Sequence, residues 1–366
     1  MSAEADGRYM RLALALGARG LGGCWPNPAV GCVLVKDGRI VGRGWTQPGG
    51  RPHAEVRALA QAGAAARGAT AYVSLEPCAH HGKTPPCAEA LVAAGVARVV
   101  TALEDPDPRV AGRGHALLRA AGIAVTEGIE AAAAERGHRG FLTRVRQGRP
   151  MMTLKLAASL DGRIATASGE SQWITGPEAR RRVHALRLAH DAVLVGGGTA
   201  RADDPQLTVR GLGDVAQPVR LIAARRLDLP QGGRLAESVA AGPLWLLHDP
   251  GQTKQVASDY WQGLGARLIP VAAEGRQLDP AAMLAALGAA GLTRVFCEGG
   301  GALGASLLAA GLVDELVVIA AGLALGAEGR PALGALGIGA LAEAPRFRLV
   351  ESAPAGGDVM MRWEAA

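Results

Sequence analysis

The stretch from His53 to Cys87 constrains this chain most, because it carries the residue types that hold a metal ion. It opens with a His-x-Glu motif and closes with two Pro-Cys pairs. One imidazole and two thiolates bind Zn²⁺ and leave its fourth position open to water, whose pKa the metal lowers. Glu55 is not a ligand in this pattern, but it is suited to carry protons to and from that water. The stretch predicts a zinc site formed by His53, Cys78 and Cys87.

A His-x-Glu motif followed by Pro-Cys and a second cysteine is typical of zinc-dependent nucleobase deaminases. The usual spacing is Cys-x-x-Cys, whereas here eight residues, 79–86, separate the two cysteines. A loop between two ligands lies beside the metal, so we expect His80, His81 and Lys83 to reach a substrate. The alternative is a structural zinc under a Cys/His-rich surface loop, but a closed site would have no use for Glu55.

The length of 366 residues suits two domains, and an apolar fraction of 49% is enough to bury two cores. Residues 1–11 do not resemble a signal peptide, and Gly, Arg and Asp interrupt every apolar run. Five cysteines, two of them assigned to zinc, favour a reducing cytosol over a disulfide framework. We therefore expect a cytoplasmic protein that does not associate with a membrane.

The net charge of +6 lies in the first part of the chain. Residues 1–148 hold 18 Lys and Arg against 12 Asp and Glu, whereas residues 149–366 hold 21 of each. A basic region suits a phosphorylated substrate or RNA, and it is equally compatible with an arginine-rich solvated surface. Aromatic residues make up only 3% of the chain, which weakens the case for RNA because single-stranded bases usually stack on aromatic rings.

Alternating helices and strands in residues 1–148 predict an α/β sandwich around one sheet. Apolar runs at 30–35 and 40–45 flank Asp37-Gly38 and predict a hairpin. Asn27, between two prolines before this hairpin, suits either a contact with a base edge or a turn. Cys32 is expected in the core, and Cys24 has no assignment. Further strands are expected at 70–75, 98–102 and 123–126, and helices at 9–19, 53–67, 88–94, 113–121 and 130–147.

The break at 148–150 separates the expected domains 1–148 and 149–366. In the second, strands at 192–195 and 294–297 each run into a glycine cluster, at 196–198 and 299–301. Glycines let backbone N–H groups approach phosphate closely, so two such clusters suit a dinucleotide. They are also ordinary turns in a glycine-rich chain, and the Rossmann fingerprint is absent.

Three charged side chains of the second domain are candidate functional residues. Lys155 lies on a strand expected at 151–156, and a buried lysine is rare without a partner. Arg187 and Arg210 suit a bidentate phosphate clamp, although most arginines on helices are solvated. Apolar segments such as 316–325 suit either the core or an interface between subunits.

Together these motifs resemble a known family, the bifunctional deaminase/reductase of riboflavin biosynthesis, over nearly the whole length. In the first domain the resemblance rests on Pro26-Asn27-Pro28, Val30-Gly31-Cys32, His53-Ala54-Glu55 and the segments 75–78 and 81–87. In the second it rests on the segments 156–162, 169–175, 202–205, 207–208, 298–300 and 311–315, together with Arg210.

For the first domain the resemblance implies a three-layer, cytidine-deaminase-like α/β fold. It implies hydrolysis of the 2-amino group of 2,5-diamino-6-(5-phosphoribosylamino)pyrimidin-4(3H)-one, with Zn²⁺ as cofactor. The zinc ligands are matched by His53, Cys78 and Cys87, the proton shuttle by Glu55, and the substrate-binding positions by Asn27, His80 and Lys83.

For the second domain the resemblance implies a dihydrofolate-reductase-like α/β fold, and reduction of the ribosyl group to ribityl with NADPH. Lys155 matches an active-site lysine. The NADP positions are matched by Ala157, Trp173, Thr199, Asp203, Gly300, Gly301, Ala302, Leu303, Gly304, Ala305 and Ser306. The substrate positions are matched by Ser171, Arg187, Leu207, Arg210 and Glu298. A homo-oligomer, either a dimer or a tetramer, is expected on the same ground.

Two positions depart from the family pattern. Thr46 stands where members usually carry a histidine that contacts the deaminase substrate. Ala224-Arg225 stands where members usually carry Asp-Ser near the cofactor. An arginine at such a place can pair with the 2′-phosphate of NADPH, which gives a hypothesis for Arg225.

Two other classes of function compete with this interpretation. A nucleic-acid base deaminase would need a groove for flanking nucleotides and usually the short Cys-x-x-Cys spacing, so no nucleic-acid partner is expected. A zinc-stabilised binding module without turnover would make no use of the proton chemistry of Glu55.

Overall fold

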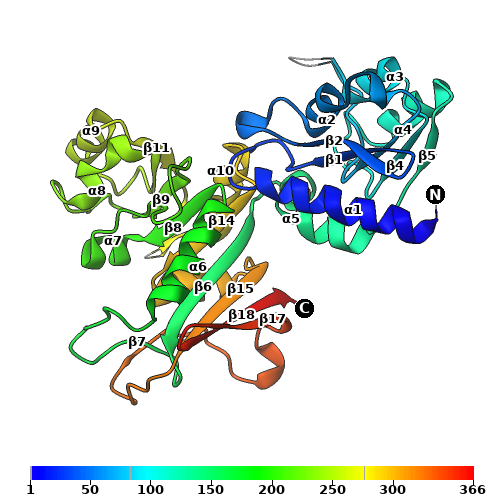
Figure 1. Ribbon diagram of the computed structural model, residues 1–366. Helices are drawn as coiled ribbons and strands as arrows, with labels where there is room; N and C mark the ends of the chain where they lie inside the picture. The colour runs from blue at the N-terminus through cyan, green and yellow to red at the C-terminus, as the bar shows by residue number, and fades with distance from the viewer. Residues whose placement is uncertain (1, 82–84, 276) are drawn as a thin grey trace. The chain divides into compact units, whose positions relative to one another are not determined.

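The computed structural model describes residues 2–81, 85–275 and 277–366, so Lys83 lies outside the described residues. The chain divides into two compact units, Met1–Gly148 and Arg149–Ala366, which are described one at a time (Figure 1). Within the described ranges, no helix combines the length and apolar character that crossing a membrane requires.

Unit 1 is built on a five-stranded sheet in the order β2-β1-β3-β4-β5. The predicted hairpin is confirmed: β1 (Gly31–Lys36) and β2 (Arg39–Trp45) are antiparallel, and Asp37 and Gly38 both turn with positive φ. β1 also pairs antiparallel with β3 (Thr70–Val73). β4 (Arg98–Thr101) and β5 (Ala124–Thr126) extend the sheet in parallel with β3.

Side-chain alternation along β1 places a helical layer on each face of this sheet (Figure 1). Cys32 and Leu34 pack on one face with α2, α3 and α4, whereas Val33 and Val35 pack on the other with α1. Cys32 is thus in the core, as expected. The helices are α1 (Ala3–Gly17), α2 (Ala54–Ala62), α3 (Cys87–Ala94), α4 (Arg113–Ala120) and α5 (Ala131–Gln147).

Unit 2 is built on a nine-stranded sheet in the order β11-β10-β9-β8-β14-β6-β15-β18-β17. The first seven strands are parallel, and the last two form an antiparallel edge. Their bounds are β11 (Arg267–Pro270), β10 (Leu244–His248), β9 (Val219–Ala223), β8 (Ala192–Gly196), β14 (Arg294–Gly299), β6 (Met151–Ser159), β15 (Glu315–Ala321), β18 (Asp358–Ala365) and β17 (Phe347–Ala355).

In the apolar segment that begins at Leu316, Val317 and Ile319 of β15 are fully buried in the core. The helices of the unit are α6 (Pro177–Leu188), α7 (Gly197–Asp203), α8 (Arg234–Glu237), α9 (Gln255–Gly263), α10 (Pro280–Ala289) and α11 (Gly301–Ala309). Short two-stranded sheets join β7 (Arg163–Ala165) to β16 (Arg330–Pro331), and β12 (Ala273–Glu274) to β13 (Gln277–Leu278).

The strand order brings the expected functional segments of unit 2 together at the carboxyl ends of the central strands. β8, β14 and β6 are parallel neighbours, so their carboxyl ends lie together. Ligands of open α/β sheets bind in the crevice at such ends. Both glycine clusters follow directly from β8 and β14, and Lys155 lies on β6.

Candidate active sites

Three metal-ligating side chains converge in unit 1. His53 precedes the first residue of α2, Cys87 is the first residue of α3, and Cys78 lies on the loop after β3. The Nδ1 atom of His53 is 3.3 Å from Sγ of Cys87 and 3.6 Å from Sγ of Cys78. Tetrahedral zinc bonds of the usual length would separate a nitrogen and a sulfur ligand by roughly 3.6 Å. Both the donor set and its spacing therefore fit a zinc ion.

Local electrostatics favour a thiolate at this cluster. The pKa of Cys78 is lowered to about 4, because Cys87 donates hydrogen bonds to it from its side chain and backbone, and because His53 lies beside it. The backbone N–H of Cys87 is 3.3 Å from Sγ of Cys78. The Sγ atom of Cys78 thus accepts an N–H group at the start of α3, where the helix dipole stabilises negative charge.

Glu55 lies in the first turn of α2, and its side chain is buried beside the two cysteines. Burial, and then the charge of Cys78, raise the pKa of Glu55 to about 6. Because Glu55 is only 3% exposed, its carboxyl group is shielded from bulk water at the edge of the His-Cys-Cys cluster. The Glu55 carboxyl group can therefore exchange protons only with groups that enter the site, as a proton shuttle requires.

Two of the expected substrate contacts lie against or near segments that carry the ligands: Asn27 contacts Gly50, and His80 follows Cys78 by two residues. The Asn27 side chain packs on Gly50, where a Cβ atom would come within 1.9 Å of its Nδ2 atom and where φ is +82°. Only glycine therefore allows Asn27 to approach the segment that leads to His53. Among the described residues, the buried Nδ1 atom of His80 has no hydrogen-bond partner, which leaves it available to a ligand. His81 instead pairs with Glu89 at 2.9 Å on the surface.

Thr46, the position of unit 1 that departs from the family pattern, has a structural role. Thr46 is buried, and its Oγ1 atom accepts a hydrogen bond from the backbone N–H of Val30 at 3.0 Å. Its side chain thus fixes the entry of β1. Cys24 is also buried, and its Sγ atom donates to the carbonyl oxygen of Asn27 at 3.4 Å, within the turn that presents Asn27.

Glu76 is a residue of this region to which the sequence gives no role. Its Oε1 atom accepts backbone hydrogen bonds from Gly114 and His115, at 2.8 and 3.2 Å. Its Oε2 atom accepts from Asp105 and Gly112, at 3.1 and 3.0 Å. One carboxylate thus caps α4 and holds the preceding loop against the segment that carries Cys78.

Replacing Glu76 with glutamine should destabilise unit 1 by about 3 kcal/mol, because an amide NH₂ then faces backbone donors that have lost their acceptor. Urea unfolding and retention of zinc during dialysis are the measurements, and both the midpoint and the zinc content should fall. Glu89→Gln is the matched control, since its pair with His81 is exposed and should change stability by less than about 0.5 kcal/mol. Equal behaviour of the two variants would contradict the capping role.

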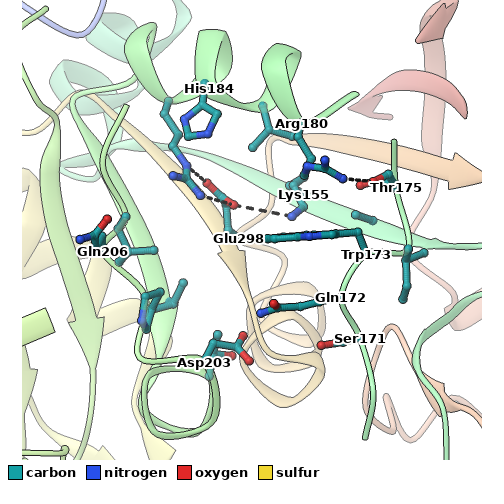
Figure 2. A pocket seen from close by; sticks show the side chains of 18 of the residues that line it. Lys155, Ser171, Gln172, Trp173, Thr175, Arg180, His184, Asp203, Gln206 and Glu298 are labelled. Carbon is teal, nitrogen blue, oxygen red and sulfur yellow. Dashed lines mark hydrogen bonds and ion pairs between the residues drawn. The ribbon is translucent and has the colours of Figure 1, made fainter. Parts of the chain in front are cut away.

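Unit 2 contains a cavity of about 470 Å³ at the carboxyl ends of its central strands. Lys155 of β6, Glu298 of β14 and Arg187 of α6 line it. Figure 2 shows Lys155, Glu298 and Trp173 facing the same space, with His184 on the helix beside them. Further residues given a cofactor or substrate role by the resemblance also line this cavity: Ala157, Ser171, Trp173, Thr199, Asp203, Leu207 and Arg210.

A cluster of three largely buried charged side chains lines this cavity. Arg187 donates to both oxygens of Glu298, with Nη2 3.0 Å from Oε2, and Nζ of Lys155 is 3.6 Å from the same Oε2 (Figure 2). Burial alone would raise the pKa of Glu298, but the charges of Arg187 and Lys155 hold it below the ordinary range. Glu298 is therefore the partner that a buried Lys155 requires.

The phosphate clamp expected from Arg187 and Arg210 needs correction. The fork of Arg187 is occupied by Glu298, and its Nη1 atom donates to the carbonyl oxygen of Thr208 at 2.7 Å. Arg210 is exposed and lines the cavity. Of the two arginines, Arg210 is therefore the one whose side chain is exposed at the cavity.

A second cavity of about 430 Å³ is lined by the first glycine cluster, 196–198, and by the first turn of α11, which follows the second cluster. Gly197, Gly198, Ala302 and Leu303 line it, together with Arg201, Arg225 and Arg226. At Gly299 a Cβ atom would come within 2.8 Å of the Val195 side chain, so close strand packing demands glycine there. The remaining expected cofactor positions in α11 include Gly304 and Ala305, which are buried against neighbouring side chains and line neither of these two cavities.

Two family models match the chain, one for each unit. Residues 3–103 match the cytidine and deoxycytidylate deaminase zinc-binding region, and residues 150–361 match the RibD C-terminal domain. A zinc-binding deaminase domain followed by a reductase domain defines the class of protein, a bifunctional deaminase/reductase. The predicted fold class, enzyme class and family resemblance are confirmed.

Relatives match over almost the full length. The riboflavin biosynthesis protein RibD of Escherichia coli is 44% identical over an alignment of 368 positions, which covers 97% of this chain and 98% of that protein. The RibD structure of Acinetobacter baumannii is 40% identical, with a TM-score of 0.88 and full coverage of both chains. A Thermotoga maritima structure is 31% identical, with a TM-score of 0.87 and coverage of 100% and 99%. The chain belongs to the RibD family and is a deaminase/reductase of riboflavin biosynthesis.

Proposed function

We propose that unit 1 deaminates 2,5-diamino-6-(5-phosphoribosylamino)pyrimidin-4(3H)-one and that unit 2 then reduces the ribosyl group of the product to ribityl with NADPH. One observation carries the proposal: a His-Cys-Cys cluster beside a buried glutamate lies in the same chain as a cavity with a buried Lys155–Glu298–Arg187 cluster. The Thermotoga maritima relative is named as a diaminohydroxyphosphoribosylaminopyrimidine deaminase and 5-amino-6-(5-phosphoribosylamino)uracil reductase, which supports these substrates.

In unit 1, His53, Cys78 and Cys87 would hold Zn²⁺, which when bound supplies Lewis-acid activation of water. Glu55 takes the proton from the attacking water, passes it to the ring nitrogen and then assists the departure of ammonia. Asn27 and His80 orient the pyrimidine. The deaminated ring keeps its phosphoribosyl group, so the product is the substrate of unit 2.

In unit 2, NADPH supplies the hydride, and the residues present fit the cofactor. Gly197, Gly198 and Ala302 line the second cavity and bring backbone close to where phosphates would lie, and the exposed Trp173 side chain lines the first cavity. Lys155, held by Glu298, faces the cavity and donates the proton that balances hydride addition to the sugar. Arg210 receives the substrate phosphate.

The partners follow from this chemistry. The substrate is a phosphorylated pyrimidine ribosylamine, and neither nucleic acid nor membrane takes part. None of the five cysteines forms a disulfide in the structure, which supports a reducing compartment such as the cytoplasm. Assembly as a dimer or tetramer stays a prediction, and sedimentation of the purified protein would test it.

The test of the proposal is to supply the purified protein with the diaminopyrimidine substrate and to follow ammonia and NADPH together. One ammonia released and one NADPH oxidised per substrate is the expected result. Ammonia without NADPH oxidation would overturn the assignment of unit 2. If neither changes while zinc is bound, the deaminase substrate is wrong, and inosine formation in tRNA would be measured next.

Arg225→Ala should raise the KM for NADPH roughly tenfold and leave the KM for NADH unchanged, because a charge-assisted contact with the 2′-phosphate is lost. Arg225 lines the second cavity, and its Nη1 atom is oriented by a 2.8 Å hydrogen bond to the carbonyl oxygen of Gly275. Arg267→Ala is the matched control, since that arginine stacks on Trp245 away from the cavity. An unchanged preference for NADPH over NADH would remove the hypothesis.

A further inference from the structure

The segment of residues 207–210, which carries Arg210 to the first cavity, is held by side chains. It belongs to no sheet, and Leu207 begins it buried, with φ of +55°. Gln217 brackets Val209: its Oε1 atom accepts the backbone N–H at 2.7 Å, and its Nε2 atom donates to the carbonyl oxygen at 3.2 Å. The amide of Gln217 thus replaces a neighbouring strand.

Helix α6 holds the two residues on either side of Val209. Arg187 donates to the carbonyl oxygen of Thr208, and the Nδ1 atom of His184, one turn earlier, accepts the backbone N–H of Arg210 at 3.2 Å. His184 also lines the first cavity, from the helix that lies beside Glu298 and Lys155 (Figure 2). Four backbone groups in a row are therefore bonded to three side chains, and two of these, His184 and Gln217, have no role in the function described so far.

We propose that His184 and Gln217 are positioning residues for the reductase substrate, which hold the segment 207–210 so that the exposed Arg210 side chain meets the substrate phosphate. The inference rests on the proposed reductase function of unit 2. An arginine on an unsupported loop would lose conformational freedom when it binds phosphate, and this loss weakens binding. Fixing the backbone beforehand removes much of that cost.

The role of His184 requires the neutral ring, since a protonated Nδ1 atom would face the N–H of Arg210 donor to donor. The charged groups that face it are Arg187 of its own helix, Arg210 of the segment and Glu298 of β14. Burial first, and then the two arginines, lower the pKa of His184, against the opposite effect of Glu298 and the Thr208 carbonyl group. The acceptor is thus present throughout the neutral range.

The experiment compares His184→Leu, which removes the acceptor, with His184→Asn, whose side-chain oxygen stands near the place of Nδ1. The substrate is 5-amino-6-(5-phosphoribosylamino)uracil, with NADPH saturating. His184→Leu should raise the KM for this substrate roughly tenfold with kcat and the Kd of NADPH unchanged, because one hydrogen bond that preorganises Arg210 is lost. His184→Asn should restore the KM to within about threefold of wild type, and Gln217→Leu should resemble His184→Leu. Arg182→Ala, on the same helix but paired with Glu178, is the control for a substitution in α6 that does not contact the segment 207–210.

Two further readouts separate positioning from general structural support. Amide hydrogen exchange at residues 209 and 210 should be faster in His184→Leu than in wild type or His184→Asn, without substrate present. Because the pKa of His184 is lowered, the wild-type KM should rise only at acidic pH, below the ordinary histidine pKa of about 6.5, and by more than the KM of His184→Asn rises. The substrate phosphate titrates in both proteins, so the difference between them reports His184.

An unchanged KM and unchanged exchange in His184→Leu would overturn the inference, and so would a fall in kcat at constant KM, which would place His184 in the chemical step. A wild-type protein that binds NADPH but never oxidises it with this substrate would overturn the proposed reductase function, and with it the substrate role of His184. The two failures are distinguishable because the first leaves wild-type turnover intact.

Discussion

Glu55→Gln should abolish ammonia release while zinc stays bound. Glutamine has the same shape, but it cannot accept the proton of the attacking water, and loss of general acid–base catalysis typically costs between about 10² and 10⁴ in rate. Glu55 is buried and is not one of the three ligands, so the substitution removes a buried ionisable group without opening the His53, Cys78 and Cys87 cluster. The measurements are ammonia release and zinc content of the same preparation.

Two comparisons make this result specific. Cys78→Ser should lose both zinc and ammonia release, whereas Glu55→Gln should lose ammonia release alone. Glu55→Gln should still oxidise NADPH at the wild-type rate when it is given the deaminated intermediate, since unit 2 is untouched. If the variant released ammonia as fast as wild type, Glu55 would not be the proton shuttle, and a zinc-stabilised module without turnover would have to be reconsidered.

Local patterns in the sequence predicted much of unit 1. The hairpin followed from two apolar runs around Asp37-Gly38, and the helix expected at 88–94 is α3, which begins at Cys87. Both elements are determined by residues that lie close together in the sequence. Glu76 was missed because its four hydrogen-bond donors lie between Asp105 and His115, far along the chain, and no local pattern announces such a contact.

The reductase cavity shows the same limit. The need of Lys155 for a partner was predictable from its place on an apolar strand, but the identity of Glu298 required the pairing of β6 with β14. The strand itself runs to Ser159 rather than residue 156, because β15 pairs with it along its last seven residues. His184 carried no signal either, since its partner is a backbone N–H of an irregular segment.

Lys155→Met should abolish NADPH oxidation and leave ammonia release unchanged. The methionine side chain fills the space of the lysine stem but donates no proton, so kcat should fall by roughly 10² to 10⁴. The fold should tolerate the change, because Glu298 keeps its two hydrogen bonds from Arg187 and is not left as an unpaired buried charge. The Kd of NADPH, measured by fluorescence quenching, should stay the same.

Glu298→Gln is the informative contrast, since Lys155 and Arg187 would then share a buried neutral amide. Removing one partner of a buried ion pair typically costs about 3–5 kcal/mol, so this variant should lose stability as well as activity. Loss of turnover in a stable Lys155→Met protein would therefore assign the lysine to the chemical step. A raised KM with unchanged kcat would instead make Lys155 a substrate-binding residue, and wild-type kinetics would leave it only the role of counterion to Glu298.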